Sequence, residues 1–281
     1  MQPWQSADPL MLQKTATEIR KSIITSLTEA KSGHLGGSLG LADFFTALYF
    51  SVLNHDPQNP GWAGRDRVIL SIGHVAPVLY ATLAHAGYFP VDELNTLRKL
   101  GTRLQGHPGR DHGLPGIELS AGSLGQGLSV AIGMAIAAKM DHRSHRIYCL
   151  HGDGELQEGS IWEAAMAASH HKLGNLTAII DRNGLQIDGN TEKVMRLEPL
   201  ADKWQSFGWN VISCDGHDFI SIITALNNAA HSGDVPSVII AKTMMGKGIP
   251  EIENDYRWHG KVPTSAQSAL FLRHLEGNNN L

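Results

Sequence analysis

Residues in the middle of the chain constrain the fold more than any other stretch, because they contain a complete strand–helix–strand unit. Bulky apolar residues predict a strand at 146–150, and apolar residues at helical spacing predict a helix from about 157 to 172. After a Gly-Asn break, a second apolar strand is predicted at 176–180. In such a unit the loops that follow the two strands lie at the same edge of a parallel sheet.

The remaining residues alternate between strand and helix patterns in the same way. Further strands are predicted at 67–71, 209–214 and 237–243. Helices are predicted at 10–31, 39–52, 75–85, 91–100, 124–140, 197–207, 219–231 and 265–275, with Ser38 as the cap of the second. The segment 101–127 shows no clear periodicity, and loops of that length are often functional. We predict a doubly wound α/β fold, with a mainly parallel sheet of about five or six strands and helices on both faces. Since no linker or repeat is visible, residues 1–281 are predicted to form a single domain.

The loops at the predicted sheet edge suit a phosphate and a metal ion. Gly152 and Gly154 allow the backbone to approach a bulky anion, and the predicted helix behind them begins with free N–H groups. Asp153 offers carboxylate oxygens and Asn183 offers an amide oxygen, which are ligands that Mg²⁺ accepts beside phosphate oxygens. The Gly-Asp-Gly triplet alone also makes ordinary turns, so its place at a strand end carries the prediction.

Four histidines lie in loops beside small residues: His34, His74, His107 and His259. A single loop histidine is usually solvated. His74, however, follows a predicted strand at the ligand edge, and His34 and His107 lie in glycine-rich loops able to fold over that edge. Imidazoles shuttle protons and bind hydroxyl groups near neutral pH, so the four are candidate catalytic residues.

Composition excludes several other classes of function. A formal net charge of −4 argues against a general nucleic-acid or anionic membrane surface. The first 14 residues lack a signal-peptide pattern, and no stretch is long enough to cross a bilayer. Cys149 and Cys214 lie inside apolar strand patterns and are predicted to be buried free thiols. These features predict a cytoplasmic protein without a membrane or nucleic-acid partner.

Several motifs together resemble one enzyme family. The Gly-Asp-Gly triplet followed by Asn183 resembles the thiamine diphosphate motif, and GDGELQEG at 152–159 is similar to its transketolase version. The segments KSGHLGGSLG, RDRVILSIGH, QGHPGRDHGLPGIELSAGSLGQG and KTMMGKGIPEIENDYRWHG also resemble transketolase segments. The resemblance covers about residues 10 to 265, which is the first of the three domains of a full transketolase.

The resemblance implies a role for each matching residue. It implies that the four loop histidines line the cofactor thiazolium and contact the ketose hydroxyls, with His74 and His259 also near the diphosphate. It implies that Asp153, Asn183 and the carbonyl of Leu185 hold Mg²⁺, or alternatively Ca²⁺ or Mn²⁺. The backbone at Gly152 and Gly154 would meet the diphosphate, and Ser123 and Leu124 fall where the family packs a residue against the aminopyrimidine.

Two acidic residues are less certain matches. Both match acidic positions of the family. The resemblance implies that Glu158 is catalytic and lies at the subunit interface, where it interacts with a glutamate of the partner domain, and that Glu163 belongs to the cofactor-binding residues. A solvated first helical turn explains both glutamates equally well. Leu35 and Ser123 stand where the family often has proline, and Gly184 replaces a longer side chain. The sequence therefore does not determine the shape of the substrate channel.

The resemblance also implies a missing half. The family's pyrimidine-binding domain, which carries the glutamate that activates the cofactor, has no counterpart in this chain. Either the chain is a truncated fragment or it is one subunit of a split enzyme. The last helix and the polar tail GNNNL favour the split enzyme, with a pyrimidine-binding partner chain in an α2β2 assembly and sugars or sugar phosphates as substrates.

Two other interpretations stay open. The α chain of a 2-oxo acid dehydrogenase also carries Gly-Asp-Gly and Asn on a separate polypeptide, although the loop histidines favour transketolase. An orphan cofactor-binding module without activity is the other. A nicotinamide-binding Rossmann domain would need GxGxxG after its first strand, and the sequence lacks it there.

Overall fold

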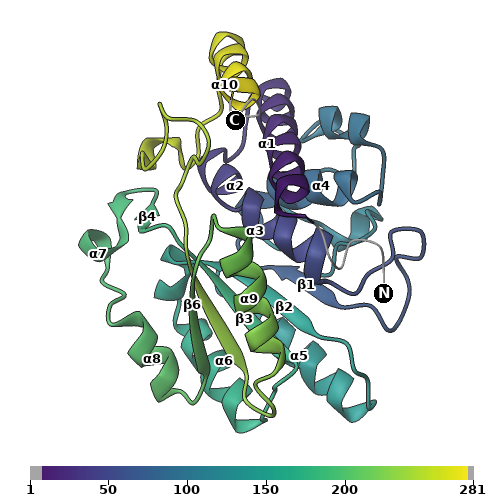
Figure 1. Cartoon of the computed structure of the whole chain (residues 1–281), viewed down its shortest axis with the longest axis vertical. Coiled ribbons are helices and arrows are strands. Elements are labelled where there is room, and N and C mark those ends of the chain that lie inside the picture. The colour runs from purple at the N-terminus through teal and green to yellow at the C-terminus, as the bar shows by residue number, and fades with distance from the viewer. Residues whose placement is uncertain (1–7, 278–281) are drawn as a thin grey trace.

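The computed structural model describes residues 8–277 and contains one five-stranded parallel sheet (Figure 1). The strands are β1 (Arg67–Leu70), β2 (Ile147–Gly152), β3 (Leu176–Arg182), β6 (Asn210–Asp215) and β7 (Ser237–Lys242), in the order β1-β2-β3-β7-β6. All four neighbouring pairs are parallel. The predicted α/β architecture is therefore confirmed. The first seven residues, where no signal peptide was expected, and the tail at 278–281 lie outside the described residues.

Helices cover both faces of the sheet, because successive strand residues point to opposite sides. Tyr148 and Leu150 belong to one buried apolar cluster, whereas Ile147 and Cys149 belong to the other. The first cluster contains residues of α1 (Pro9–Ala30), α3 (Ala42–Ala47), α4 (Ala76–His85), α9 (Phe219–Ala230) and α10 (Ser265–Gly277). The second contains residues of α5 (Gly127–Met140), α6 (Gly159–His170) and α8 (Leu200–Ser206). Cys149 and Cys214 are buried free thiols, as predicted.

The strand order reverses between β3 and β7, and this reversal locates a ligand crevice. From β3 the chain continues to α8 on one face, whereas from β7 it continues to α10 beside α1 on the other (Figure 1). The loops beyond these adjacent strand ends consequently diverge and leave a gap at the carboxyl edge. Open α/β sheets bind ligands at such a switch point.

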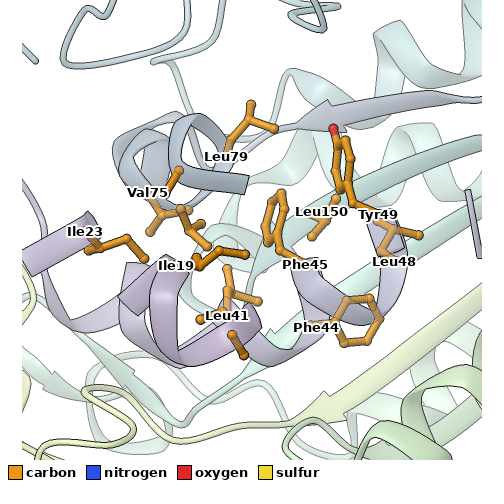
Figure 2. Close-up of a cluster of buried hydrophobic side chains, with 14 of the residues drawn as sticks. Ile19, Ile23, Leu41, Phe44, Phe45, Leu48, Tyr49, Val75, Leu79 and Leu150 are labelled. Atoms are coloured by element: carbon orange, nitrogen blue, oxygen red, sulfur yellow. The ribbon is translucent and has the colours of Figure 1, made fainter. Parts of the chain in front are cut away.

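The apolar cluster between α1 and α4 holds two of the predicted site loops in place. Figure 2 shows Ile19 and Ile23 of α1 in the same buried cluster as Val75 and Leu79, and these four side chains are at most 2% exposed. His34 follows the end of α1, and His74 immediately precedes Val75 in the 3₁₀ turn η2 (Gly73–Val75). Packing of α1 against α4 therefore sets the distance between these two histidines.

The predicted helix at 39–52 is wrong in detail. The chain there forms α2 (Gly36–Gly40), α3 and a π-helical turn, η1 (Leu48–Val52). Glycines in α2 pack against a neighbouring loop, since a Cβ on Gly40 would lie 2.9 Å from the carbonyl oxygen of Met244. Ser38 does not cap a helix, because it lies inside α2 and its hydroxyl donates to the carbonyl of His34 at 2.8 Å.

Other local predictions differ from the structure at the ends of elements. The predicted helix at 91–100 is a 3₁₀ helix, η3 (Val91–Thr96), and the predicted helix at 157–172 is preceded by a separate 3₁₀ turn, η5 (Gly154–Gln157). Between β3 and α8 the structure adds a small hairpin, β4 (Leu185–Gln186) with β5 (Gly189–Asn190), and the short helix α7 (Thr191–Val194). Two further 3₁₀ turns are η4 (Arg110–His112) and η6 (Tyr256–Trp258). These elements are too short for sequence periodicity to show them.

A buried ion pair joins α1 to α3. Arg20 donates from Nη1 and Nη2 to the two carboxylate oxygens of Asp43 at 2.8 and 2.7 Å, and His217 Nδ1 lies 2.8 Å from Asp43 Oδ2. Burial alone would raise the pKa of Asp43, but Arg20 and His217 lower it to about 2. Met244 N–H donates in turn to His217 Nε2 at 2.8 Å, so the network reaches the loop after β7.

Replacing Asp43 with alanine is expected to lower the free energy of unfolding by about 3–5 kcal/mol, because Arg20 is left as an uncompensated buried cation. Urea unfolding at neutral pH measures the change. Asp92→Ala, which removes an exposed carboxylate, is the matched control and should change stability by less than about 0.5 kcal/mol. An equally small effect of both substitutions would contradict the expected contribution of the buried ion pair to the free energy of unfolding.

Candidate active site

A cavity of about 530 Å³ opens at the carboxyl edge of the sheet, where the ends of β1, β2 and β3 line it together with the loop after β7. Its wall contains eleven of the thirteen predicted site residues: His34, His74, His107, Leu124, Gly152, Asp153, Gly154, Glu158, Asn183, Leu185 and His259. Ser123 and Glu163 do not line this cavity and are exposed to solvent. The fold thus brings together residues more than 200 positions apart in the sequence.

Three of the loop histidines form a compact group on one side of the cavity. The ring centroids of His34 and His74 are 5.0 Å apart, those of His74 and His259 are 5.0 Å apart, and those of His34 and His259 are 5.6 Å apart. His107 reaches the same cavity from the long loop before α5. The Nδ1 atoms of His34 and His259 are buried without a hydrogen-bond partner among residues 8–277. Buried polar atoms normally have partners, so these atoms fit a polar ligand.

Burial keeps these imidazoles neutral. Burial, together with the neighbouring imidazoles and with Arg98, lowers the pKa of His34 to about 4. Burial and the neighbouring imidazoles lower the pKa of His74 to about 3. Burial also lowers the pKa of His259, and burial together with Arg98 lowers that of His107. Neutral imidazoles can accept a hydrogen bond at one nitrogen and donate from the other. The cluster therefore suits hydroxyl groups better than a permanent anion.

The low histidine pKa values predict that acid destabilises the folded chain. An unfolded chain protonates its imidazoles near pH 6.5, whereas folded His74 resists protonation down to about pH 3. Between these values the unfolded state binds more protons, so the free energy of unfolding falls as the pH falls, by up to about 1.4 kcal/mol per pH unit for His74. Urea unfolding at pH 7.5, 6 and 5 measures the slope. The slope of His74→Gln should be shallower, and an unchanged slope would rule out this contribution.

Asp153 is held in place by three polar partners. Its Oδ1 accepts from the N–H of Gly154 at 2.8 Å, and its Oδ2 accepts from the N–H of Gly184 at 2.6 Å and from Arg182 Nη1 at 3.0 Å. The residue is 1% exposed. Burial raises the pKa of Asp153, and these hydrogen bonds oppose the rise. A carboxylate oxygen has two lone pairs, so Asp153 Oδ1, which accepts one hydrogen bond, can still bind a cation.

Asn183 is oriented by its neighbours on the next strand end. Its Nδ2 donates to Asp181 Oδ2 at 2.8 Å, and its Oδ1 accepts from the N–H of Leu185 at 2.9 Å. Burial and the nearby Asp153 together raise the pKa of Asp181 to about 7, although hydrogen bonds from Thr243 and Asn183 oppose this rise. Asn183 lines the cavity at the turn that continues into β4.

The donor set suits a hard divalent cation only together with a ligand. Within residues 8–277, no three histidine, cysteine, aspartate or glutamate side chains come together as a metal site. Asp153, Asn183 and a backbone carbonyl such as that of Leu185 are oxygen donors and leave part of an octahedral shell open. Magnesium sites commonly fill that part with phosphate oxygens and water.

Glycine gives the cavity its space beside these donors. A Cβ on Gly152 would lie 3.1 Å from Ile72, and one on Gly154 would lie 3.3 Å from the side chain of Gln186. The 3₁₀ turn η5 separates these glycines from α6, which begins at Gly159, close to the predicted start. In this structure the N–H of Gly154 is already bonded to Asp153, which limits what it offers to an anion.

The two predicted glutamates lie in different surroundings. Glu158 precedes α6 at the cavity wall, is exposed, and makes no capping hydrogen bond. Glu163 is exposed farther along α6, away from the cavity wall. Of the two, only Glu158 can reach a molecule bound in this cavity or a protein surface that closes it.

Sequence reasoning missed several charged residues at the site. Arg182 donates to Asp153, to Glu192 and to Glu198, which ties the loop after β2 to the segment after β5. Glu155 is buried beside His151, and although burial acts in the opposite direction, this neighbour holds the pKa of Glu155 below its usual value. Burial opposes protonation of His151 as well, but Cys149 and Glu155 raise its pKa. The position of Glu155 directly after the Gly-Asp-Gly triplet was the available signal in the sequence.

The chain is similar in sequence to known transketolase proteins. Residues 11–278 match the family described as "Transketolase, thiamine diphosphate binding domain". The chain is 47% identical over 271 residues to a 6-deoxy-6-sulfo-D-fructose transketolase subunit from Clostridium sp. strain MSTE9, covering 96% of this chain and 98% of the relative. It is 43% identical over 256 residues to one of the subunits of apulose-4-phosphate transketolase from Phocaeicola vulgatus, covering 91% of this chain and 90% of the relative.

Full-length enzymes match over part of their length. The crystal structure of transketolase from Campylobacter jejuni superimposes with a TM-score of 0.89 at 35% identity, covering 98% of this chain and 43% of that one. Human transketolase is 41% identical over 251 residues, covering 89% of this chain and 40% of the human sequence. The chain thus spans about two fifths of the length of these full-length proteins.

Proposed function

The chain belongs to the transketolase family, whose thiamine diphosphate-binding domain it contains, and we propose that it is the cofactor-binding subunit of a two-chain transketolase. Such an enzyme transfers a two-carbon ketol unit from a ketose, or ketose phosphate, to an aldose. The single observation that carries the proposal is the cavity that gathers Asp153, Asn183 and the four loop histidines at one sheet edge. In this proposal residues 1–281 act as one domain.

The proposed cofactor site follows from the donor atoms and the space between them. Asp153, Asn183 and the carbonyl of Leu185 would hold Mg²⁺, which in turn would bind the diphosphate. Gly152 and Gly154 would leave room for that group, and Leu124 would pack against the aminopyrimidine. Thiamine diphosphate supplies a carbon nucleophile when it is bound. Neither Ser123 nor Glu163 has support from the cavity geometry for a direct contact with it.

The histidines have a proposed role that matches their neutral state. His34, His74, His107 and His259 would bind the hydroxyl groups of the ketose and move protons between oxygen atoms, since neutral imidazoles do both. His74 and His259 also lie on the side of the cavity from which they could reach the diphosphate. Glu158, exposed at the cavity wall, would face the partner chain and contribute to cofactor activation there.

A second polypeptide is part of the proposal. Two relatives that this chain covers almost end to end are named as transketolase subunits, whereas full-length transketolases are more than twice as long as the matched part. We propose that a separate chain supplies the pyrimidine-binding half and that the two assemble as α2β2. The two buried free thiols favour a reducing, cytoplasmic location. Within residues 8–277, no helix has the length and apolar character needed to cross a membrane.

The reaction class can be tested on the complex. Co-expression with a chain that carries the pyrimidine-binding domain, followed by a screen of ketose donors and aldose acceptors, should reveal glycolaldehyde transfer. Because relatives are named for 6-deoxy-6-sulfo-D-fructose and apulose-4-phosphate, both ketoses belong in the screen beside simple pentose phosphates. Reduction of lipoyl groups with a 2-oxo acid instead would identify a dehydrogenase-type chain. Cofactor binding without any group transfer would identify an inactive binding module.

A further inference from the structure

One buried carboxylate joins three segments that end at the cavity. Glu155 lies in η5 and is 2% exposed. Its Oε1 accepts from the hydroxyl of Ser71 at 2.5 Å and from the N–H of Gly125 at 2.8 Å, while its Oε2 lies 2.9 Å from Nδ1 of His151. The carboxylate therefore connects the end of β1, the end of β2 and the loop that precedes α5.

The loop before α5 is held most tightly at Gly125. Its N–H is bonded to Glu155, and its carbonyl accepts from the hydroxyl of Ser160 at 3.1 Å. The residue has φ of +83°, and a Cβ there would lie 2.6 Å from Ser160 Oγ. The hydroxyl of Ser71 accepts in addition from the N–H of Gly127 at 3.1 Å. Hydrogen bonds on both sides of Gln126 thus lead back to Glu155, directly or through Ser71.

We propose that Glu155 is a positioning residue that holds the loop 123–127, and with it Leu124, against the cofactor site, and that His151 is its buried partner. Leu124 precedes Gly125 and lines the cavity, so a shift of Gly125 moves it directly. Glu155 does this through backbone N–H groups and needs no contact with the cofactor. The effect on cofactor binding rests on the function proposed above, whereas the effect on the loop does not.

The physical reason is that, among the described residues, the Gly125 N–H has Glu155 as its acceptor and is shielded from water. Gly125 is buried and Ser71 is 1% exposed, so neither can turn to water if the carboxylate is removed. A buried donor without an acceptor is costly, and the loop would move to find one. If Glu155 served only as the partner of His151 in a buried pair, replacing both residues by apolar residues would leave the loop 123–127 unchanged, because such pairs can often be replaced without loss of stability.

Two variants separate these roles. The double substitution His151→Leu with Glu155→Leu removes both partners together and so avoids an unpaired buried charge. It should therefore unfold at a higher temperature than Glu155→Leu alone, although the N–H of Gly125 still loses its acceptor. Glu155→Gln keeps one oxygen acceptor for Ser71 and Gly125 and can donate to an unprotonated His151 nitrogen, so it should preserve the loop. Hydrogen exchange of a peptide covering residues 119–128 reads the loop, and titration of the reconstituted complex with thiamine diphosphate and Mg²⁺ reads the cofactor.

In the double variant the amide hydrogens of this peptide should exchange with solvent about tenfold faster than in the unchanged chain, because the loop opens more often. It should also bind thiamine diphosphate about tenfold more weakly, as expected when one buried hydrogen bond to the loop is lost. Glu155→Gln should restore both values to within about threefold. Unchanged exchange in a stable double variant would overturn the inference. Faster exchange with unchanged affinity would overturn its link to Leu124, while failure of the unchanged complex to bind the cofactor would instead refute the proposed function.

Discussion

Asp153→Ala is expected to abolish Mg²⁺-dependent binding of thiamine diphosphate to the complex, with a loss of at least about 100-fold in affinity. Substitutions outside the direct ligands of a metal typically cost about 10–100-fold, and Asp153 would be the single carboxylate among the proposed ligands. Its removal leaves an amide and a carbonyl as protein donors, which are too few to anchor Mg²⁺ beside a diphosphate. Isothermal titration with the cofactor, with and without Mg²⁺, measures the loss.

A matched control separates this effect from a general change of charge at the cavity. Asp188 is an exposed carboxylate that also lines the cavity, so Asp188→Ala should change the affinity less than about threefold. Asp153→Ala should still fold, because Arg182 keeps Glu192 and Glu198 as partners. Retention of Mg²⁺-dependent binding by a folded Asp153→Ala chain would remove the proposed metal site.

The purified chain alone is expected to show no ketol transfer, and addition of the pyrimidine-binding chain should produce it. Forming the reactive carbanion requires removal of a proton from the thiazolium, and in the family this depends on a glutamate beside the aminopyrimidine from the other domain. Glu158, an exposed residue of the cavity wall, is available to contact such a second chain.

A coupled assay of the chain, the partner and the mixture at equal concentrations measures this dependence. Glu158→Gln should lower the activity of the mixture or weaken assembly while leaving the fold of the isolated chain unchanged, since this exposed side chain makes no capping hydrogen bond. Substantial turnover by the isolated chain with thiamine diphosphate and Mg²⁺ would contradict the two-chain proposal.

Local patterns and the order of elements were sufficient to predict the sheet and its ligand edge. The strand–helix–strand unit around Gly152–Gly154 and Asn183 allows few arrangements, because right-handed crossovers between parallel strands bring both loops to one edge. The loop histidines could be named because small residues surround them. Short elements such as β4, β5 and η5 could not, because they contain less than one repeat of either periodicity.

Only the tertiary structure decided how charge and burial are distributed at this edge. The low pKa values of His34 and His74 arise from burial and from the neighbouring imidazoles of His107 and His259, which come from distant segments of the chain. The same packing buries Glu155 and leaves Glu163 in solvent, although both glutamates follow the same motif within nine positions. A sequence determines which side chains are available and which strand ends they follow, because those depend on local periodicity and chain order. It leaves open which of them lose their water, because desolvation depends on atoms supplied by distant segments.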